Sequence, residues 1–315
     1  MNRRVRLSSR ALPPPLVQQR SRSAPLPSRY LFSAPRAVAL LNAALVLAVL
    51  LFLGSPAAAL DVFQYDPVIN FRFSHGTYVD ARMEENPRFL LAGYDLSGLG
   101  WGPGNFGVTL ISPRHFLTAA HVAPAPGSTV SFLARDGVVR HYVVESIHVI
   151  EYRTGVATDL VVGRLTAAVP PGDGVGCFPT LRLPLNSGYV GMTVYSFGIY
   201  QACGLNTIAR WGVYDLLPFT RGDHVADDVM FVTEWHRTAG QAQAQGNDSG
   251  SPTFVLAHGR LALIGTHSAV DVRQEPYTTL DVLVPAYFTQ IDQQLQRDGY
   301  QFGNTAAGPP ESSRP

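Results

Sequence analysis

Short runs of β-forming residues recur along most of this chain, and each is bounded by residues that favour turns. Nine such runs occur between residues 107 and 284, separated by Gly, Pro, Asn and Asp. They are Gly107–Ile111, Thr129–Leu133, Tyr142–Ile150, Leu160–Leu165, Met192–Phe197, Val229–Trp235, Pro252–Leu256, Leu261–His267 and Thr279–Val284. Many short strands at this spacing are typical of an antiparallel barrel or sandwich, whereas βαβ units would place a helix after each strand. The sequence therefore predicts an all-β body.

One helix is predicted, over Pro285–Arg297. Proline is favoured in the first turn of a helix, and apolar residues recur behind it at helical spacing. These residues are Tyr287, Phe288, Ile291 and Leu295. The last residues, 304–315, are rich in Pro, Ser and Gly, and we expect them to form a disordered tail.

The N-terminal region has the layout of an export signal. Residues 1–59 contain eight Arg and no acidic residue, and they include a largely apolar run from Ala37 to Leu53. The small residues Ala57-Ala58-Ala59 follow, as at the cleavage site of a signal peptide. We expect cleavage after Ala59. The alternative is a single membrane anchor, since a run of about 17 residues is near the shortest that spans a bilayer. Either way the body is expected to be exported. With cleavage, it is expected to be secreted or periplasmic and to have no membrane contact.

Charge and composition exclude several classes of function. All 24 basic residues are Arg, so Schiff-base and P-loop lysine chemistry is excluded. After residue 59 the chain has 16 basic and 23 acidic side chains, a formal charge of −7, which argues against nucleic-acid binding. The nine His show no zinc-ligand spacing such as H-E-x-x-H, so we expect neither a metal nor another cofactor.

Two further groups of residues have more than one interpretation. In an oxidising compartment a disulfide between Cys177 and Cys203 is allowed, but spacing alone does not bring the two within bonding distance. Asp223, Asp227 and Asp228 are candidate calcium ligands, yet they lack the regular spacing of a calcium loop. A solvated loop is the expected setting of these acids.

Three short segments carry candidate catalytic residues. His121 follows small residues after a predicted strand, which leaves room for an imidazole. Asp159 stands at the start of an apolar strand, where a buried acid needs a partner. Ser249 is flanked by Gly246 and Gly250, which allow a tight turn with converging backbone N–H groups. Each residue alone also has an ordinary interpretation, as a core His, a turn Asp or a loop Ser.

Taken together, the strings TAAH, DLVVGRL and NDSGSP, in the order His, Asp, Ser, resemble the trypsin/chymotrypsin-like serine protease family. The resemblance runs from about Gly100 to the predicted helix. It implies a double six-stranded β-barrel of the chymotrypsin type with a C-terminal helix. The expected segments are a signal peptide over 1–59, an N-terminal extension over 60–84, a first barrel over 85–185, a second barrel with the helix over 186–303, and the tail over 304–315.

The resemblance also implies an activity, the hydrolysis of polypeptide substrates through an acyl-enzyme. Ser249 would be the nucleophile, His121 the general base, and Asp159 the residue that orients the imidazole. The backbone N–H groups of Asn247 and Ser249 would form the oxyanion hole. Ser268 would pair with the substrate backbone and support Asp159.

The chain departs from the family at positions that bear on activity. Asn247 stands where most members have Gly, because the backbone there adopts a conformation that is costly for other residues; Asn tolerates a positive φ better than most. Val122 replaces a Cys common in animal members, which favours a bacterial type. No Ile-Val-Gly-Gly segment precedes the His strand. We therefore expect local hydrogen bonds, rather than a salt bridge from a new N-terminus, to hold Asp248.

Three residues bear on substrate specificity. Gln243 takes the place of the Asp found in trypsin-like members six residues before the nucleophile, so cleavage after Lys or Arg is not expected. His267 resembles the pocket histidine of glutamyl endopeptidases, which would favour an acidic side chain, unless it merely packs inside the second barrel. Val270 would narrow the pocket and favour small residues. These hypotheses compete.

The sequence thus predicts an exported, monomeric serine endopeptidase that is not specific for Lys or Arg. The alternative is a secreted binding or adhesion protein that keeps the protease fold with little or no turnover. Asn247 is the feature that favours this alternative.

Overall fold

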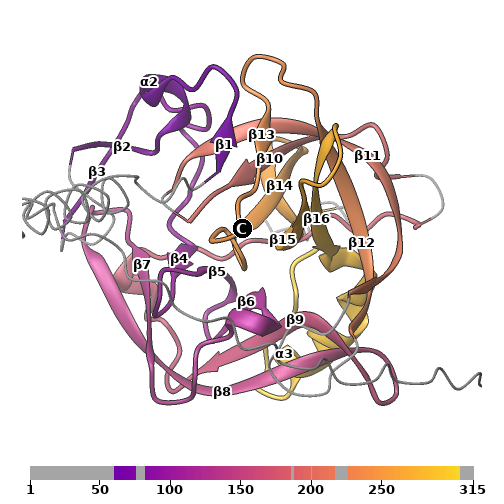
Figure 1. Ribbon diagram of the computed structural model, residues 1–315. Helices are drawn as coiled ribbons and strands as arrows, with labels where there is room; N and C mark the ends of the chain where they lie inside the picture. The colour runs from indigo at the N-terminus through magenta and orange to yellow at the C-terminus, as the bar shows by residue number, and fades with distance from the viewer. Residues whose placement is uncertain (1–59, 76–81, 186–187, 200, 217–225, 306–315) are drawn as a thin grey trace, which may run out of the picture. The chain divides into compact units, whose positions relative to one another are not determined.

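The computed structural model describes residues 60–75, 82–185, 188–199, 201–216 and 226–305. In this part the strands form two closed six-stranded barrels, in the orders β4-β5-β6-β9-β8-β7 and β10-β11-β12-β16-β15-β14 (Figure 1). The predicted double β-barrel is confirmed. The predicted signal peptide and its alternative, a membrane anchor, lie outside the described residues. Within the described ranges, no helix is both long and apolar enough to cross a membrane.

The first barrel brings the ends of two strands together. Its strands are β4 (Leu99–Trp101), β5 (Gly107–Ser112), β6 (His115–Ala119), β7 (Thr129–Leu133), β8 (Val139–Arg153) and β9 (Val156–Leu165). β6 and β9 are antiparallel neighbours, with Ala119 opposite Leu160. The chain leaves β6 into the short 3-10 helix η1 (Ala120–Val122). This pairing places His121, just after β6, beside Asp159 near the start of β9.

The second barrel contains a long strand that the sequence pattern does not show. Its strands are β10 (Thr193–Phe197), β11 (Cys203–Leu216), β12 (Ala226–Trp235), β14 (Pro252–Ala257), β15 (Arg260–Asp271) and β16 (Tyr277–Leu283). β11 was not predicted because polar residues such as Asn206 and Arg210 interrupt its apolar positions. Its described side chains are buried near Cys203 and largely half-exposed or exposed from Thr207 onward. β4 was also not predicted.

The start of the predicted N-terminal extension, residues 60–84, pairs with a distant part of the chain. β1 (Asp61–Val62) pairs with β13 (Ala242–Gln243), shortly before the Ser249 loop. The segment continues through α2 (Pro67–Asn70) and β2 (Phe73–His75), and β2 pairs with β3 (Glu84–Glu85). The start of the predicted extension therefore adds a strand beside the second barrel.

The C-terminal helix is confirmed, with a 3-10 start. η3 (Val284–Tyr287) leads into α3 (Phe288–Gln296), and the predicted apolar face supplies Tyr287, Ile291 and Leu295 to the core. Thr305 belongs to the predicted tail, but its N–H donates to the carbonyl of Thr180 at 2.9 Å. Residues 306–315 lie outside the described residues.

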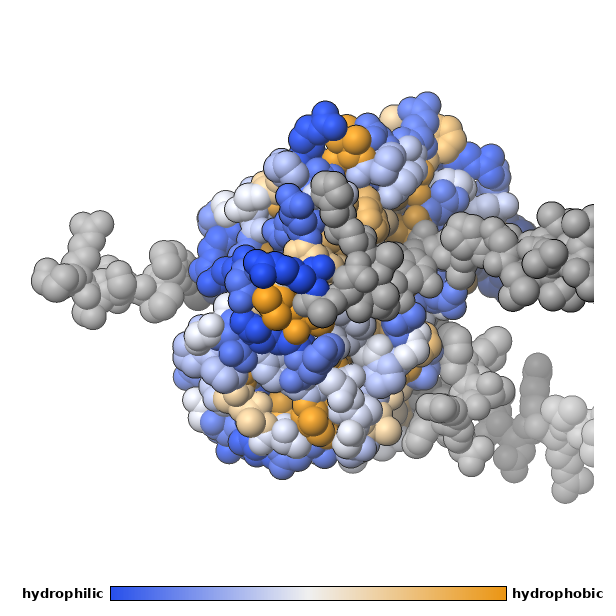
Figure 2. Space-filling view, turned by 90° about the vertical axis from the view of Figure 1, so that its left-hand side faces the viewer, coloured by the Kyte–Doolittle hydropathy of each residue, from blue (hydrophilic) through white to orange (hydrophobic). Residues whose placement is uncertain are grey.

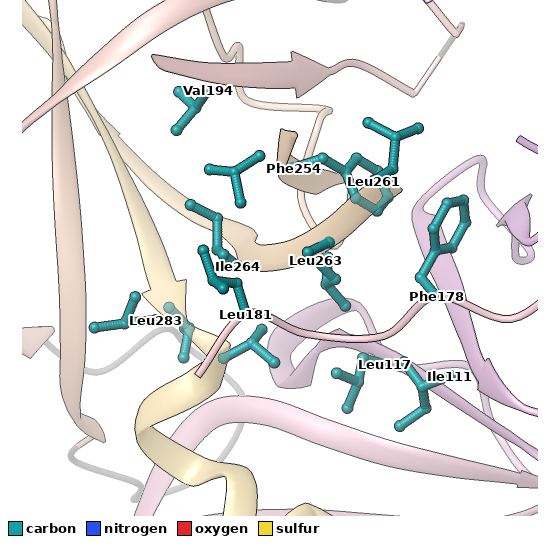
Figure 3. Close-up of a cluster of buried hydrophobic side chains, with 14 of the residues drawn as sticks. Ile111, Leu117, Phe178, Leu181, Val194, Phe254, Leu261, Leu263, Ile264 and Leu283 are labelled. Atoms are coloured by element: carbon teal, nitrogen blue, oxygen red, sulfur yellow. The ribbon is translucent and has the colours of Figure 1, made fainter. Parts of the chain in front are cut away.

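One apolar core continues from barrel to barrel (Figure 3). Leu117 comes from the first barrel, Phe254 and Leu263 from the second, and Phe178 from the connection between them. The rings of Phe178 and Phe254 lie 4.6 Å apart between centroids. On the face shown in Figure 2, hydrophobic residues form small groups among hydrophilic ones. Close packing in the shared core resists relative movement of the barrels, and it therefore fixes the strand ends that carry the candidate site.

Gly107 allows the first barrel to approach the backbone around Ser249. A Cβ at Gly107 would lie 2.4 Å from Cα of Ser251, which no real contact permits. The Gly107 N–H donates to the carbonyl of Ser249 at 3.1 Å, and Thr118 Oγ1 donates to the carbonyl of Gly107 at 2.7 Å. Glycine is thus required here by the close approach of two backbones.

We expect Gly107→Ala to lower the free energy of unfolding by about 1–3 kcal/mol, because the added methyl group overpacks a backbone contact. Gly172→Ala is the matched control. A Cβ at Gly172 has no neighbour within 4 Å, and this variant should stay within about 0.5 kcal/mol of the parent. Urea unfolding measures both. Equal stabilities of the two variants would contradict a tight contact at Gly107.

Candidate active site

His121, Asp159 and Ser249 meet between the two barrels. His121 Nδ1 lies 2.8 Å from Asp159 Oδ2, and His121 Nε2 lies 2.8 Å from Ser249 Oγ. The first two residues come from the first barrel, and Ser249 lies in the loop before β14. A hydroxyl bonded to a base, which is itself oriented by an acid, is the arrangement that activates a nucleophile. The structure therefore brings together the three residues predicted to be catalytic.

Asp159 is buried and surrounded by hydrogen-bond donors. Its Oδ1 accepts the backbone N–H of His121 at 3.0 Å, and its Oδ2 accepts the hydroxyl of Ser268 at 2.5 Å. On its other side, the Asp159 N–H donates to Asp228 Oδ2 at 2.8 Å. Ser268 and Asp228 both belong to the second barrel. Asp159 is thus held by groups from both barrels.

Asp248, next to the nucleophile, is held partly by distant residues. Its carboxylate accepts backbone N–H groups of Gln245 at 2.8 Å, Ile199 at 2.9 Å and Leu60 at 2.8 Å. Burial raises the pKa of Asp248, and these hydrogen bonds together with His267 only partly oppose the rise. Local hydrogen bonds alone were predicted. That prediction is incomplete, because Leu60, the residue after the predicted cleavage site, is one of the three donors.

The turn before Ser249 does not have the backbone conformation expected at Asn247. The Asp248 N–H donates to the carbonyl of Gln245 at 2.9 Å and closes a four-residue turn. Asn247 is not among the described residues with positive φ, and neither is Gly246. In such a turn, φ at the third residue, here Asn247, is positive in type II and negative in type I. The central peptide points in opposite directions in the two types. The Asn247 N–H is therefore directed as in a type I turn.

A pocket of about 300 Å³ lies beside Ser249. Its lining is His121, Ala244, Gln245, Gly246, Ser249, His267, Ser268, Ala269 and Val270. Three of the predicted substrate-binding residues, His267, Ser268 and Val270, thus border it. Gln243 does not. It is buried in β13, and its Nε2 has no hydrogen-bond partner among the described residues.

Both ring nitrogens of His267 are already bound. Nδ1 lies 2.6 Å from Asp281 Oδ1, and Nε2 lies 2.9 Å from the carbonyl of Phe197. A carbonyl oxygen only accepts, and a carboxylate does the same, so both nitrogens act as donors and the ring carries a proton on each. Burial lowers the pKa of His267, but the ion pair with Asp281 outweighs it and raises the pKa overall. The imidazole consequently has no N–H left for an acidic substrate side chain.

Two interpretations of other residues change with the structure. Cys177 and Cys203 are free, so the candidate disulfide is not formed. Cys203 is buried at the start of β11 in the second barrel, whereas Cys177 is exposed in the segment that connects the two barrels. Asp228 was assigned to a solvated loop, but it lies in β12 with no exposed surface. Asp223 lies outside the described residues. The residues around Asp228 in the sequence show no pattern that would reveal its burial, because that burial depends on strand pairing.

Comparisons with known proteins give one family match that covers the candidate site. A family model described as Trypsin matches residues 105–293. Among solved structures, the crystal structure of the scabies mite inactivated protease paralogue S-I1 is similar, at 14% identity and a TM-score of 0.46, over 64% of this chain and 96% of that one. No curated protein sequence matches the chain. Because the family model covers more than half of the chain and includes His121, Asp159 and Ser249, the chain belongs to the trypsin family.

Proposed function

We propose that this chain is an exported serine endopeptidase that cleaves polypeptides through an acyl-enzyme. The observation that carries the proposal is the unbroken series of hydrogen bonds from Ser249 Oγ through His121 to Asp159. Membership of the trypsin family supports a serine protease in general. Export rests on the N-terminal sequence, with its apolar run and small-residue cleavage site.

In the proposed reaction, His121 acts first as a general base and then as a general acid in each half-reaction. Ser249 Oγ attacks the peptide carbonyl carbon while its proton passes to His121 Nε2, and the same proton then goes to the leaving amine. Asp159 stabilises the imidazolium that forms between these steps. Water, deprotonated by His121, then attacks the acyl carbon; the bond from that carbon to Ser249 Oγ breaks, His121 returns the proton to Ser249 Oγ, and the acid product leaves.

The oxyanion hole is incomplete in this conformation. Two N–H groups, of Asn247 and Ser249, would have to converge on the developing oxyanion. The Gly246–Asn247 peptide must rotate before the first of them does so, because Asn247 lacks the positive φ of a type II turn. Asn accepts positive φ more readily than most residues, so this rotation is accessible.

The pocket favours a small, uncharged side chain at the cleaved residue. Gln243 supplies no carboxylate that would bind Lys or Arg, and it does not line the pocket. His267 donates its two ring N–H groups to Asp281 and to the carbonyl of Phe197, so an acidic substrate side chain would gain no hydrogen bond from it. Ala244, Ala269 and Val270 line the pocket, and Val270 is only half-buried. Small aliphatic residues match this lining best.

Removal of the signal peptide would give Asp248 a counter-ion. Cleavage after Ala59 converts the Leu60 amide into a free ammonium group, at the atom that already lies 2.8 Å from Asp248 Oδ2. A buried carboxylate is costly unless it is paired. Export and stabilisation of the nucleophile loop would then be linked by one cleavage.

The second candidate function is a secreted binding protein with the protease fold and little turnover. The observation that favours it is the turn at Asn247, which leaves one oxyanion donor misdirected. The intact contacts of His121, Asp159 and Ser249 argue against it, because a binding scaffold has no need for all three. The two candidates differ in turnover and in reaction with a serine-directed probe.

Ser249→Ala and Asp159→Asn test the triad. We expect the parent to react with a fluorophosphonate and to cleave casein, the Ser249→Ala protein to do neither, and Asp159→Asn to lower kcat by about 10⁴-fold. Ser251→Ala, which changes a buried serine two residues away, is the control and should keep the activity. Cleavage by the Ser249→Ala protein at the parental rate would exclude the proposed nucleophile.

Asn247→Gly tests the oxyanion hole. Glycine adopts positive φ without strain, so we expect kcat to rise, by up to the factor of about 10² that one donor contributes. Asn105→Gly is the matched control, because Asn105 already has a φ of 65° and lies outside the pocket lining. If Asn247→Gly leaves an inert protein inert, the binding-protein function is favoured.

The N-terminus can be tested with two chains that differ only before Leu60. A chain that begins at Leu60 should react with the fluorophosphonate at least about tenfold faster than one with Gly-Ser added in front, because only the first has an ammonium at Asp248. In Asp248→Asn this difference should disappear. Equal rates for the two parental chains would rule out the linkage.

A further inference from the structure

Asp228 is a buried carboxyl group behind the catalytic pair. It has no exposed surface, and its Oδ2 accepts the backbone N–H of Asp159 at 2.8 Å. It lies in β12 of the second barrel, whereas Asp159 lies in β9 of the first. The hydrogen bond therefore joins the two barrels directly at a triad residue. The proposed reaction does not otherwise use Asp228.

The surroundings of Asp228 contain few groups that could neutralise it. Its Oδ1 lies 3.4 Å from the hydroxyl of Tyr287, which itself accepts the Val229 N–H at 2.8 Å. On its own strand, Asp227 is a further acid, and Arg153 of β8 lies 3.5 Å from that neighbour rather than from Asp228. Burial and then the charge of Asp228 raise the pKa of Tyr287, and Tyr152 of β8 adds a smaller rise. From the other barrel, the charge of Asp159 acts on Asp228.

These surroundings shift the titration of Asp228 into the neutral range. Burial is the largest effect and raises its pKa, the hydrogen bond from Asp159 lowers it, and the charges of Asp159 and then Asp227 raise it again. Together they bring the pKa of Asp228 to about 7. Asp228 is consequently neutral in mildly acidic solution and ionised in mildly alkaline solution.

We propose that Asp228 is a positioning residue for Asp159, which holds the Asp159 backbone from the second barrel and adds a negative charge behind the His121–Asp159 pair when it is ionised. The inference rests on the proposed protease function. The acceptor role exists in both charge states, because neutral and ionised carboxyl groups both accept a hydrogen bond. The charge exists only above about pH 7.

The expected consequence is a rise in activity between weakly acidic and alkaline solution. A negative charge behind Asp159 stabilises the imidazolium that His121 forms in the transition state. Asp228 is separated from the His121 imidazole by Asp159, with one hydrogen bond on either side of it. At such a distance in a partly screened interior, one charge changes the rate by about threefold to tenfold. Protonation of Asp228 removes this contribution.

Asp228→Asn is the informative variant, because the amide oxygen still accepts the Asp159 N–H but never carries the charge. We expect kcat/KM to be about threefold to tenfold below the parent at about pH 8.5, and within about twofold of it at about pH 5.5. Asp227→Asn removes a neighbouring charge that does not touch Asp159, and it should follow the parental pH profile much more closely. A parental profile for Asp228→Asn would overturn the charge role.

Asp228→Ala tests the positioning role separately. It removes the acceptor, so kcat should fall at every pH, by more than in Asp228→Asn, while KM changes little. Urea unfolding is measured alongside to confirm that both variants are folded. Equal kcat values for folded Asp228→Ala and Asp228→Asn at about pH 5.5 would overturn the positioning role.

Carbon-13 NMR of the aspartate carboxyl groups tests the coupling without any turnover. The resonance missing in Asp228→Asn identifies Asp228, and its midpoint should lie near pH 7 in the parent. In Asp159→Asn this midpoint should fall, because the repelling charge has gone. An unmoved midpoint would refute the inference even in an active protease. If the midpoint moves but the protein shows no turnover, the coupling stands and only the proposed function is refuted.

Discussion

The satisfaction of one buried carboxylate, that of Asp159, organises the centre of this molecule. A charge out of water is tolerated only where several donors surround it. Those donors come from both barrels: the His121 ring and N–H from the first, and the Ser268 hydroxyl from the second. All of these donors reach Asp159 only when the two barrels dock in one orientation. The same docking brings Ser249 to His121 Nε2.

A second buried carboxylate, that of Asp248, organises the loop that carries the nucleophile. It accepts hydrogen bonds from the loop itself, from Ile199 shortly after β10, and from Leu60. The start of the predicted extension is thereby part of the active-site structure rather than an appendage. In the proposed mechanism, the turn between Gln245 and Asp248 must change its backbone, because Asn247 lacks the positive φ of a type II turn.

Sequence patterns identified most of the architecture but not its long-range contacts. Regular strands with clean alternation were found, and so was the helix after Pro285, because each depends on its own residues. β11 escaped notice, since Asn206 and Arg210 interrupt its apolar positions and only pairing with β10 and β12 makes it a strand. The roles of Asp228 and Leu60 were missed for the same reason. Nothing in the segment around Asp228 distinguishes a buried acid from a solvated one, and nothing around Leu60 indicates that its N–H meets Asp248.

The sequence by itself determined the residue types of the triad, their order along the chain and the family to which they point. These follow from short motifs in which spacing and chemistry are local. Only the tertiary structure decided that His267 points both nitrogens at Asp281 and Phe197, that Cys177 and Cys203 stay apart, and that Asp228 sits behind Asp159. The physical reason is that burial and hydrogen-bond partners are set by strands distant in sequence. A side chain's type fixes what it can bind, and the packing of the two barrels fixes what it meets.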